Sequence, residues 1–218
     1  MLSTYTYPKF EYVCPPEVAE QRSGHYPVVI VGAGPVGLSM AIDLAAQGQQ
    51  VLLLDNDDTV SIGSRGVCYA KRTLEVLDRL NCGAPAVEKG VSWNVGRTFF
   101  GDGEVFNFNL CPQEGHQRPG MVNLQQYYLE DYLVARARQL PNLEMRFKNN
   151  VISVEQDDAQ ATVRVETPDG AYTLTTDWLV AADGARSPIR TMLGLDIEGK
   201  IFMDRFLIAD VVMKADYP

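Results

Sequence analysis

The chain has 218 residues, 46% of them hydrophobic, which is enough for a core that supports one large or two small domains. Its formal net charge of −9 argues against a nucleic-acid-binding surface, because phosphate neutralisation needs clustered Lys and Arg side chains and the sequence has no such cluster. No apolar run reaches 18 residues and the first residues lack the pattern of a secretory signal, so we expect a cytoplasmic protein with no membrane partner.

The first predicted strand begins near Pro27, after an extension of residues 1–26, and a glycine-rich turn follows it. The turn has the sequence Gly32, Ala33, Gly34, Pro35, Val36 and Gly37. Gly32 and Gly34 let the backbone bend tightly and approach a pyrophosphate, while Gly37 lets a helix pack closely on the strand. A helical pattern ends at Gly48, and a second apolar strand, 51–54, leads into Asp55.

This strand–helix–strand unit predicts a dinucleotide site. The start of the helix favours a doubly negative phosphate, and Asp55 is placed to accept hydrogen bonds from ribose hydroxyls. The alternative is a glycine-rich turn without a ligand, but the helical spacing and the 18 residues from Gly37 to Asp55 favour the site. At this point the ligand can be FAD or NAD(P), because both use this turn.

Two further elements are predicted between residues 56 and 110. A loop, 56–66, precedes a helix with a buried stripe of Leu74, Leu77 and Leu80, which ends at Cys82-Gly83. Residues 91–110 then indicate an antiparallel hairpin with a turn at 101–103 and alternating phenylalanines. That aromatic face could wall an aromatic substrate pocket, but we expect it to be the buried face of a sheet.

The second half of the chain returns to the first sheet. We expect a helix over residues 124–140, a short strand over 143–147, and a three-stranded meander over 151–155, 161–166 and 172–176. A separate strand over 178–182 leads into Asp183 and Gly184, and a last apolar strand is expected over 206–213. Ser187 and Pro188 suit the N-cap and first turn of a helix.

The sequence offers little for metal or nucleophilic chemistry. The four cysteines show no C-x-x-C pairing and have no histidines at ligand spacing, so we predict reduced structural thiols and no metal site. With only His25 and His116 present, a histidine-based triad is not expected. No catalytic acid or base is identified.

Three patches in order resemble the FAD-dependent aromatic hydroxylases, the single-component flavoprotein monooxygenases related to p-hydroxybenzoate hydroxylase and 3-(3-hydroxyphenyl)propionate hydroxylase. They are the unit 32–55, the segment 64–67 before a helix, and the segment 183–190 that begins Asp-Gly. The resemblance covers almost the whole chain from Pro27 onward and favours FAD over NAD, because ordinary nicotinamide dehydrogenases lack the Asp-Gly segment. It implies an α/β fold: a Rossmann-like FAD-binding domain with a parallel sheet and a three-stranded meander, and the beginning of an inserted antiparallel substrate-domain sheet.

The resemblance also implies cofactor-binding roles outside the first turn. It places Arg65 near the FAD ribose and phosphates, Asp183 and Gly184 beside the pyrophosphate, and Gln126 on the flavin side, and it adds Val151 to the cofactor-binding residues. Simpler interpretations exist: Arg65 as a solvated loop arginine, and Gln126 as part of a capping-box-like helix start with Asn123. Gln125 is an adjacent rival for the flavin contact.

The implied function is hydroxylation of an aromatic, phenolic compound with FAD, NAD(P)H and dioxygen. The expected organisation is an extension, 1–26; an FAD-binding domain, 27–90 and 120–200; and an incomplete substrate-domain sheet, 91–119 and 201–218. Family members are longer, so we expect a fragment whose substrate contacts lie elsewhere and which alone has little or no turnover. Alternatives are another flavin enzyme, such as an epoxidase, halogenase or reductase, a non-catalytic nucleotide-binding module and, less favoured, a nicotinamide dehydrogenase; homo-oligomerisation is left open.

Overall fold

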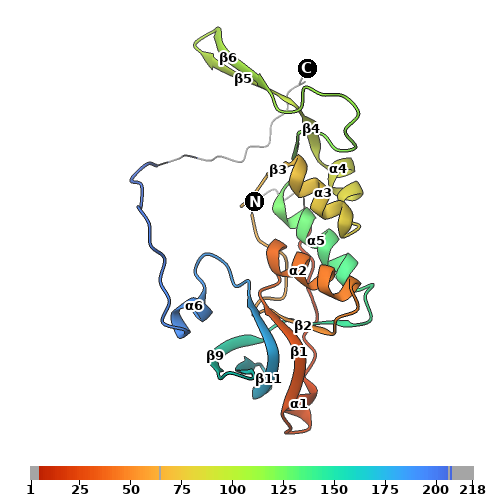
Figure 1. The fold of residues 1–218 in the computed structure, drawn as a ribbon, viewed down its shortest axis with the longest axis vertical. Coiled ribbons are helices and arrows are strands. Elements are labelled where there is room, and N and C mark those ends of the chain that lie inside the picture. Colours follow the sequence, from red (N-terminus) through yellow and green to blue (C-terminus); the bar gives the residue numbers. More distant parts are fainter. Residues whose placement is uncertain (1–4, 64, 206, 208–218) are drawn as a thin grey trace.

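The computed structural model describes residues 5–63, 65–205 and 207 (Figure 1). Its helices are α1 (Pro16–Ala19), α2 (Pro35–Ala46), α3 (Lys71–Arg79), α4 (Gly83–Lys89), α5 (Gln126–Ala137) and α6 (Pro188–Met192). Its strands are β1 (Gly24–Val31), β2 (Val51–Leu54), β3 (Cys68–Ala70), β4 (Val91–Trp93), β5 (Val95–Phe100), β6 (Gly103–Asn109), β7 (Met121–Asn123), β8 (Leu143–Arg146), β9 (Asn150–Gln156), β10 (Ala161–Thr167) and β11 (Gly170–Ala181).

A six-stranded sheet in the order β8-β2-β1-β11-β10-β9 forms the base of the fold. The first four strands in this order are parallel, and β9, β10 and β11 form an antiparallel meander. The chain moves from β1 through β2 to β8 in one direction and then returns to place β11 on the other side of β1. Such a reversal creates a crevice at the carboxyl ends of the two strands, where ligands bind in open α/β sheets. The α/β fold and the meander are as predicted.

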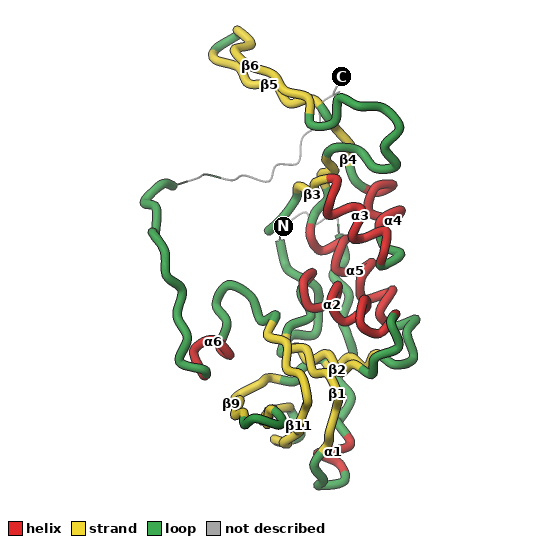
Figure 2. The backbone as a smooth tube through the Cα atoms, in the orientation of Figure 1, coloured by secondary structure: helices red, strands yellow, loops and turns green. Residues whose placement is uncertain are grey.

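The central strands are buried on both faces, which explains their continuous apolar sequence. Val28 and Ile30 in β1 pack into the cluster formed with α2 and α5, whereas the alternate residues Val29 and Val31 pack into the cluster formed with the meander. Figure 2 shows the helices α2, α5, α3 and α4 gathered on one side of this sheet. Packing on both faces of the sheet therefore holds the carboxyl ends of β1 and β11 in place.

The N-terminal extension packs on the fold through buried polar contacts. Glu17 in α1 accepts from the Arg146 guanidinium of β8 at 2.9 Å and from the Tyr26 hydroxyl at 2.7 Å. Burial pushes the pKa of Glu17 up, but the hydrogen bonds from Tyr26 and Arg146 outweigh it and hold that pKa below its usual value. The ionised Glu17 thus ties the extension to the sheet.

The predicted hairpin is present as β5 and β6, but its aromatic face is not buried. Phe99, Phe100 and Phe106 are all more than half exposed among the described residues. The hairpin extends away from the helices at one end of the molecule (Figure 1). The expectation of a buried aromatic face is wrong for this part of the chain.

Several element boundaries also differ from expectation. The first strand begins at Gly24, and the two strands expected at 172–176 and 178–182 are one strand, β11. Its first part pairs with β10 and its last part with β1, and the shared stretch keeps it continuous. The helix expected over 124–140 is α5, with Gln125 as N-cap and no side-chain cap, so the proposed capping box with Asn123 is wrong.

Other elements had no sequence-based prediction or lie outside the description. The short helix α4 and the small sheet β3-β7-β4 were not predicted. The strand expected over 206–213 lies outside the described residues apart from residue 207. No helix in the described part of the chain is long and apolar enough to cross a membrane.

Candidate functional site

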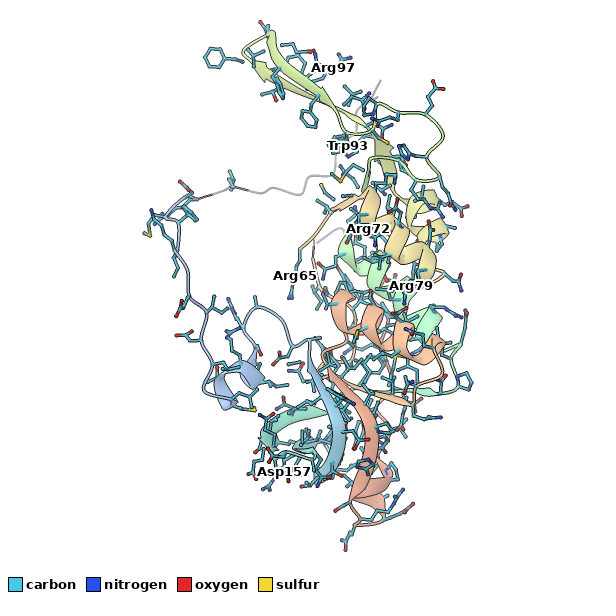
Figure 3. All side chains as sticks on the ribbon, in the orientation of Figure 1. Arg65, Arg72, Arg79, Trp93, Arg97 and Asp157 are labelled. Carbon is cyan, nitrogen blue, oxygen red and sulfur yellow. The ribbon has the colours of Figure 1, made fainter. Side chains whose placement is uncertain are left out.

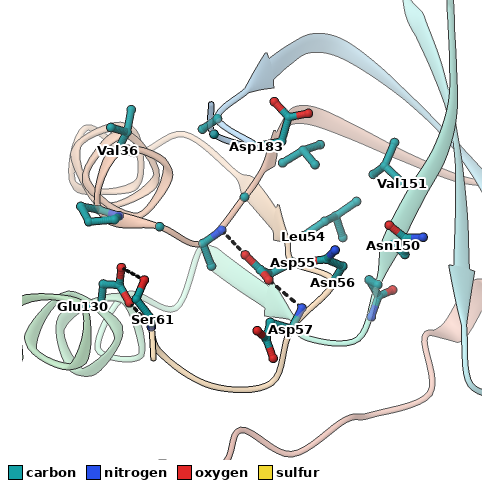
Figure 4. A pocket seen from close by; sticks show the side chains of 18 of the residues that line it. Val36, Leu54, Asp55, Asn56, Asp57, Ser61, Glu130, Asn150, Val151 and Asp183 are labelled. Atoms are coloured by element: carbon teal, nitrogen blue, oxygen red, sulfur yellow. Dashed lines mark hydrogen bonds between the residues drawn. The ribbon is translucent and has the colours of Figure 1, made fainter. Parts of the chain in front are cut away.

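A cavity of about 440 Å³ lies at the carboxyl ends of β1, β2 and β11, beside the start of α2. Every predicted site residue except Gly37 lines it: Gly32, Ala33, Gly34, Pro35, Val36, Asp55, Arg65, Gln126, Val151, Asp183 and Gly184. Its position is the crevice that the strand order creates, and its volume is typical of small-molecule sites. Figure 4 shows Asn150 and Val151 on one side of Asp55 and Ser61 and Glu130 on the other.

The three glycines of the first turn have different structural roles. A Cβ at Gly32, where φ is +107°, would lie 2.4 Å from the Ala182 carbonyl oxygen, and a Cβ at Gly37 would lie 1.9 Å from the Gly32 carbonyl oxygen. Both residues are therefore required by packing. Gly34 has an ordinary φ of −76° and its Cβ would meet nothing within 4 Å. The protein itself does not need glycine at 34, so the space beside it is available to a ligand.

Asp55 closes the turn over the end of β2. Its carboxylate accepts from the backbone N–H of Ala33 and, at 2.7 Å, from that of Asp57 (Figure 4). Burial raises the pKa of Asp55 above its usual value, although the two N–H donors oppose this. A carboxylate offers about four acceptor positions, so a ribose hydroxyl can still be bound.

The Asp-Gly segment after β11 joins the sheet to α6. Asp183 accepts from the backbone N–H of Ile189 at 3.0 Å, and the Ser187 hydroxyl accepts from the backbone N–H of Arg190 at 3.0 Å. Ser187 is the N-cap of α6 and Pro188 its first residue, as predicted. Gly184, with φ +86°, turns the chain at the rim of the cavity.

Two side chains that were not predicted form the floor of the cavity on the α5 side. Glu130 is 2% exposed and accepts from the backbone N–H and, at 2.7 Å, the hydroxyl of Ser61. Gln126 donates through Nε2 to Glu130 at 2.7 Å and to Ser61 at 3.1 Å. Glu130 follows Gln126 by four residues on α5, a spacing that puts both side chains on one face of the helix, so Glu130 could have been predicted from Gln126. Nothing in the sequence singles out Ser61.

Arg65 is exposed, lines the cavity, and lies on the loop between β2 and β3 (Figure 3). The carboxylates that line the cavity are Asp55, Asp57, Glu130 and Asp183. Arg65 is the one basic side chain among the described residues of the lining. A dianionic group must therefore be held mainly by backbone N–H groups at the start of α2, where the helix dipole helps, with Arg65 as the side-chain contribution.

The lining fits an adenine dinucleotide. It has an acidic residue for a ribose, an open glycine position at a helix N-terminus for a pyrophosphate, and the apolar side chains of Val151 and Ile189 for a flat base. For metals the result is different: the described residues contain no group of three or more His, Cys, Asp or Glu side chains that could hold an ion.

Comparisons with known proteins agree with this geometry. A family model described as "FAD binding domain" matches residues 25–218. Para-nitrophenol 4-monooxygenase of Pseudomonas sp. (strain WBC-3) is 34% identical over 187 residues, covering 84% of this chain and 46% of that protein. A 3-(3-hydroxy-phenyl)propionate/3-hydroxycinnamic acid hydroxylase of Burkholderia vietnamiensis is 32% identical over 191 residues, covering 84% of this chain and 34% of that protein.

Solved structures give the same result. The crystal structure of p-nitrophenol 4-monooxygenase from Pseudomonas putida DLL-E4 superposes with a TM-score of 0.76 at 31% identity, covering 82% of this chain and 46% of that one. Aklavinone-11 hydroxylase, in a complex with FAD and aklavinone, has a TM-score of 0.68 at 30% identity, covering 79% of this chain and 35% of that one. The chain spans less than half the length of each of these relatives.

Proposed function

The chain belongs to the FAD-binding-domain family of the flavin-dependent monooxygenases, and on that premise we propose that it supplies the FAD site of an enzyme that hydroxylates an aromatic, phenolic compound with NAD(P)H and dioxygen. The observation that carries the proposal is the open space at Gly34. It lies at a helix N-terminus, at the sheet reversal, which supports binding of the pyrophosphate of a dinucleotide there. FAD, when bound, supplies the redox chemistry of the reaction.

We assign the predicted residues to parts of the cofactor. Within the turn, the backbone N–H groups of Gly34 and Val36 would hold the pyrophosphate, because those of Gly32 and Ala33 already donate to Leu54 and Asp55 and Pro35 has none. Asp183 and Gly184 would lie opposite, while Gly37 serves packing. Asp55 would accept from the adenosine ribose, and Val151 would lie against the adenine. Arg65 and Gln126 would face the phosphates and the flavin side.

The sheet's role in this reaction is to hold these groups still. The turn is fixed on one side by Asp55 and on the other by the contact of α2 with the Gly32 carbonyl, so the N–H donors are oriented before the ligand arrives. We further propose the division expected from the sequence: residues 27–90 and 120–200 hold the cofactor, and 91–119 and 201–218 belong to a sheet that faces the substrate.

The direct test is a binding titration followed by an oxidation assay. We expect flavin fluorescence to be quenched on addition of the protein to FAD, ADP to compete, and FMN to bind at least tenfold more weakly, because the described cavity receives the adenosine and pyrophosphate half. Equal affinity for FMN would contradict the assignment.

Turnover distinguishes the enzyme classes. NAD(P)H oxidation stimulated by phenols, with a hydroxylated product, would establish the hydroxylase in a protein of the relatives' full length that contains this chain. Products of epoxidation or halogenation instead would indicate another flavin enzyme. FAD binding by that full-length protein without any turnover would favour the non-catalytic module.

A further inference from the structure

A buried carboxylate without a cationic partner lies under the cavity. Glu130 is 2% exposed, and no ion pair within the described ranges includes it. Its charge is compensated by the Ser61 backbone N–H, the Ser61 hydroxyl and the Gln126 side-chain amide. A buried carboxylate is costly unless its oxygens are hydrogen-bonded, and all of these donors come from residues of the cavity lining.

The carboxylate determines which way the Gln126 amide faces. An ionised carboxylate only accepts hydrogen bonds, so it requires the NH₂ end of the amide. Nε2 of Gln126 is accordingly directed at Glu130 and Ser61, and Oε1 is turned the other way, 3.2 Å from the position of a Cβ on Gly66. Gly66 follows Arg65 in the chain. The amide therefore presents an acceptor on the side of the Arg65 loop.

The same carboxylate ties that loop to α5. Ser61 lies in the middle of the connection between β2 and β3, and both of its polar groups donate to Glu130 (Figure 4). Arg65 is four residues further along and also lines the cavity. Glu130 thus joins the two parts of the lining, Gln126 and the Arg65 loop, that come from distant parts of the sequence.

We propose that Glu130 is a positioning residue of the FAD site: its carboxylate turns the Gln126 amide so that Oε1 accepts from a hydroxyl group of the cofactor. The inference rests on the proposed function. Glu130 itself need not touch FAD, because its effect on binding passes through Gln126 and, through Ser61, the loop.

Glu130→Gln tests this with little change of shape. One carboxylate oxygen accepts from the Ser61 backbone N–H and the other from both the Ser61 hydroxyl and the Gln126 amide, whereas a neutral amide has only one acceptor oxygen. In one orientation the new NH₂ faces the Ser61 backbone N–H, and in the other it faces Nε2 of Gln126 and favours the flipped Gln126 amide. Once the amide flips, Oε1 no longer accepts from the cofactor hydroxyl, and the loss of that one hydrogen bond predicts a rise in the Kd for FAD of about tenfold.

A double-mutant cycle separates positioning from a general loss of structure. The Kd for FAD is measured by fluorescence quenching for the wild-type protein, Glu130→Gln, Gln126→Ala and the double variant, and each apo form is melted. We expect the Glu130→Gln factor to fall to about threefold or less when Gln126 is already Ala, because the amide it orients is gone. Asp131→Asn, the next carboxylate on α5 and not part of the lining, is the matched control and should leave the Kd unchanged.

The outcomes are distinct. An unchanged Kd in Glu130→Gln, or the same factor in both backgrounds, overturns the positioning role while leaving FAD binding intact. A wild-type protein that binds no FAD overturns the proposed function and this inference together. If Glu130→Gln does not fold, Ser61→Ala takes its place in the cycle, and an effect independent of Gln126 would refute the proposal.

Discussion

Gly34 and Gly37 belong to one sequence motif, but the structure gives them opposite roles, and replacing each by alanine separates those roles. In Gly34→Ala the new Cβ meets no protein atom within 4 Å and the backbone φ of −76° is ordinary. The methyl group instead enters the space assigned to the pyrophosphate. In Gly37→Ala the Cβ falls 1.9 Å from the Gly32 carbonyl oxygen, so α2 must move away from β1.

The magnitudes follow from these contacts. For Gly34→Ala we expect the free energy of unfolding to fall by about 1 kcal/mol or less, because Gly34 is the N-cap of α2 and alanine is a poorer N-cap than glycine. Its Kd for FAD should rise roughly 5- to 150-fold, because overpacking by one methyl group costs about 1–3 kcal/mol. For Gly37→Ala the same overpacking falls on the fold, which lowers Tm by roughly 2–12 °C for a chain of this size.

The assay compares thermal melts of the apo proteins with FAD titrations of the same samples. Gly48→Ala is the control: Gly48 ends α2 with φ +89° and open space around it, so alanine should cost about 1–2 kcal/mol of stability without changing the Kd. Wild-type affinity in Gly34→Ala would refute the placement of the pyrophosphate beside residue 34. Unchanged stability in Gly37→Ala would refute the packing argument.

Three further predictions concern charged groups. Arg65→Ala should raise the Kd for FAD roughly fivefold at low salt, about 1 kcal/mol, and by less at high salt. Arg72→Ala is the control and should leave the Kd unchanged, because Arg72 lies outside the cavity. Equal effects of the two substitutions would contradict the role assigned to Arg65. The pKa of Asp55 is raised in the folded protein, so just above pH 3.8 the folded state binds more protons than the unfolded state. The stability of the wild type relative to Asp55→Asn should therefore fall as the pH rises through that window. Thermal melts that show the opposite slope would refute the raised pKa. Glu17→Ala should cost about 3–5 kcal/mol in urea unfolding, because it leaves a buried guanidinium without this partner, while Glu144→Ala, whose side chain is 50% exposed, should cost under about 1 kcal/mol; similar losses would argue against the buried pair.

The parts of the fold that the sequence predicted are those set by local geometry. The turn at Gly32, the stop at Gly48 and the meander turns each depend on a few neighbouring residues, and each is found where expected. The continuity of β11 was missed because it depends on two partners: β10 up to Thr176, and β1 as far as Ala181. Pairing between distant strands leaves no mark in a single stretch of sequence.

The hairpin shows a different limit. Alternation along β5 and β6 predicts correctly that Phe106 and Phe108 lie on one face, because side chains alternate across a strand. Alternation does not specify what covers that face. Burial depends on another element reaching it, and among the described residues none does.

The site repeats this contrast in its electrostatics. Considered by side-chain charge, a lining with four carboxylates and only Arg65 as a cation would argue against a dianionic ligand. The glycine spacing nevertheless predicts a dianionic ligand, because backbone N–H groups and the helix dipole would attract it, and these depend on the path of the chain and not on charged side chains. The same logic explains why Glu130 was overlooked: its charge is compensated by Ser61, sixty-nine residues away, through hydrogen bonds that exist only in the fold. Side-chain charge alone therefore argues against the proposed ligand, whereas the backbone geometry supports it.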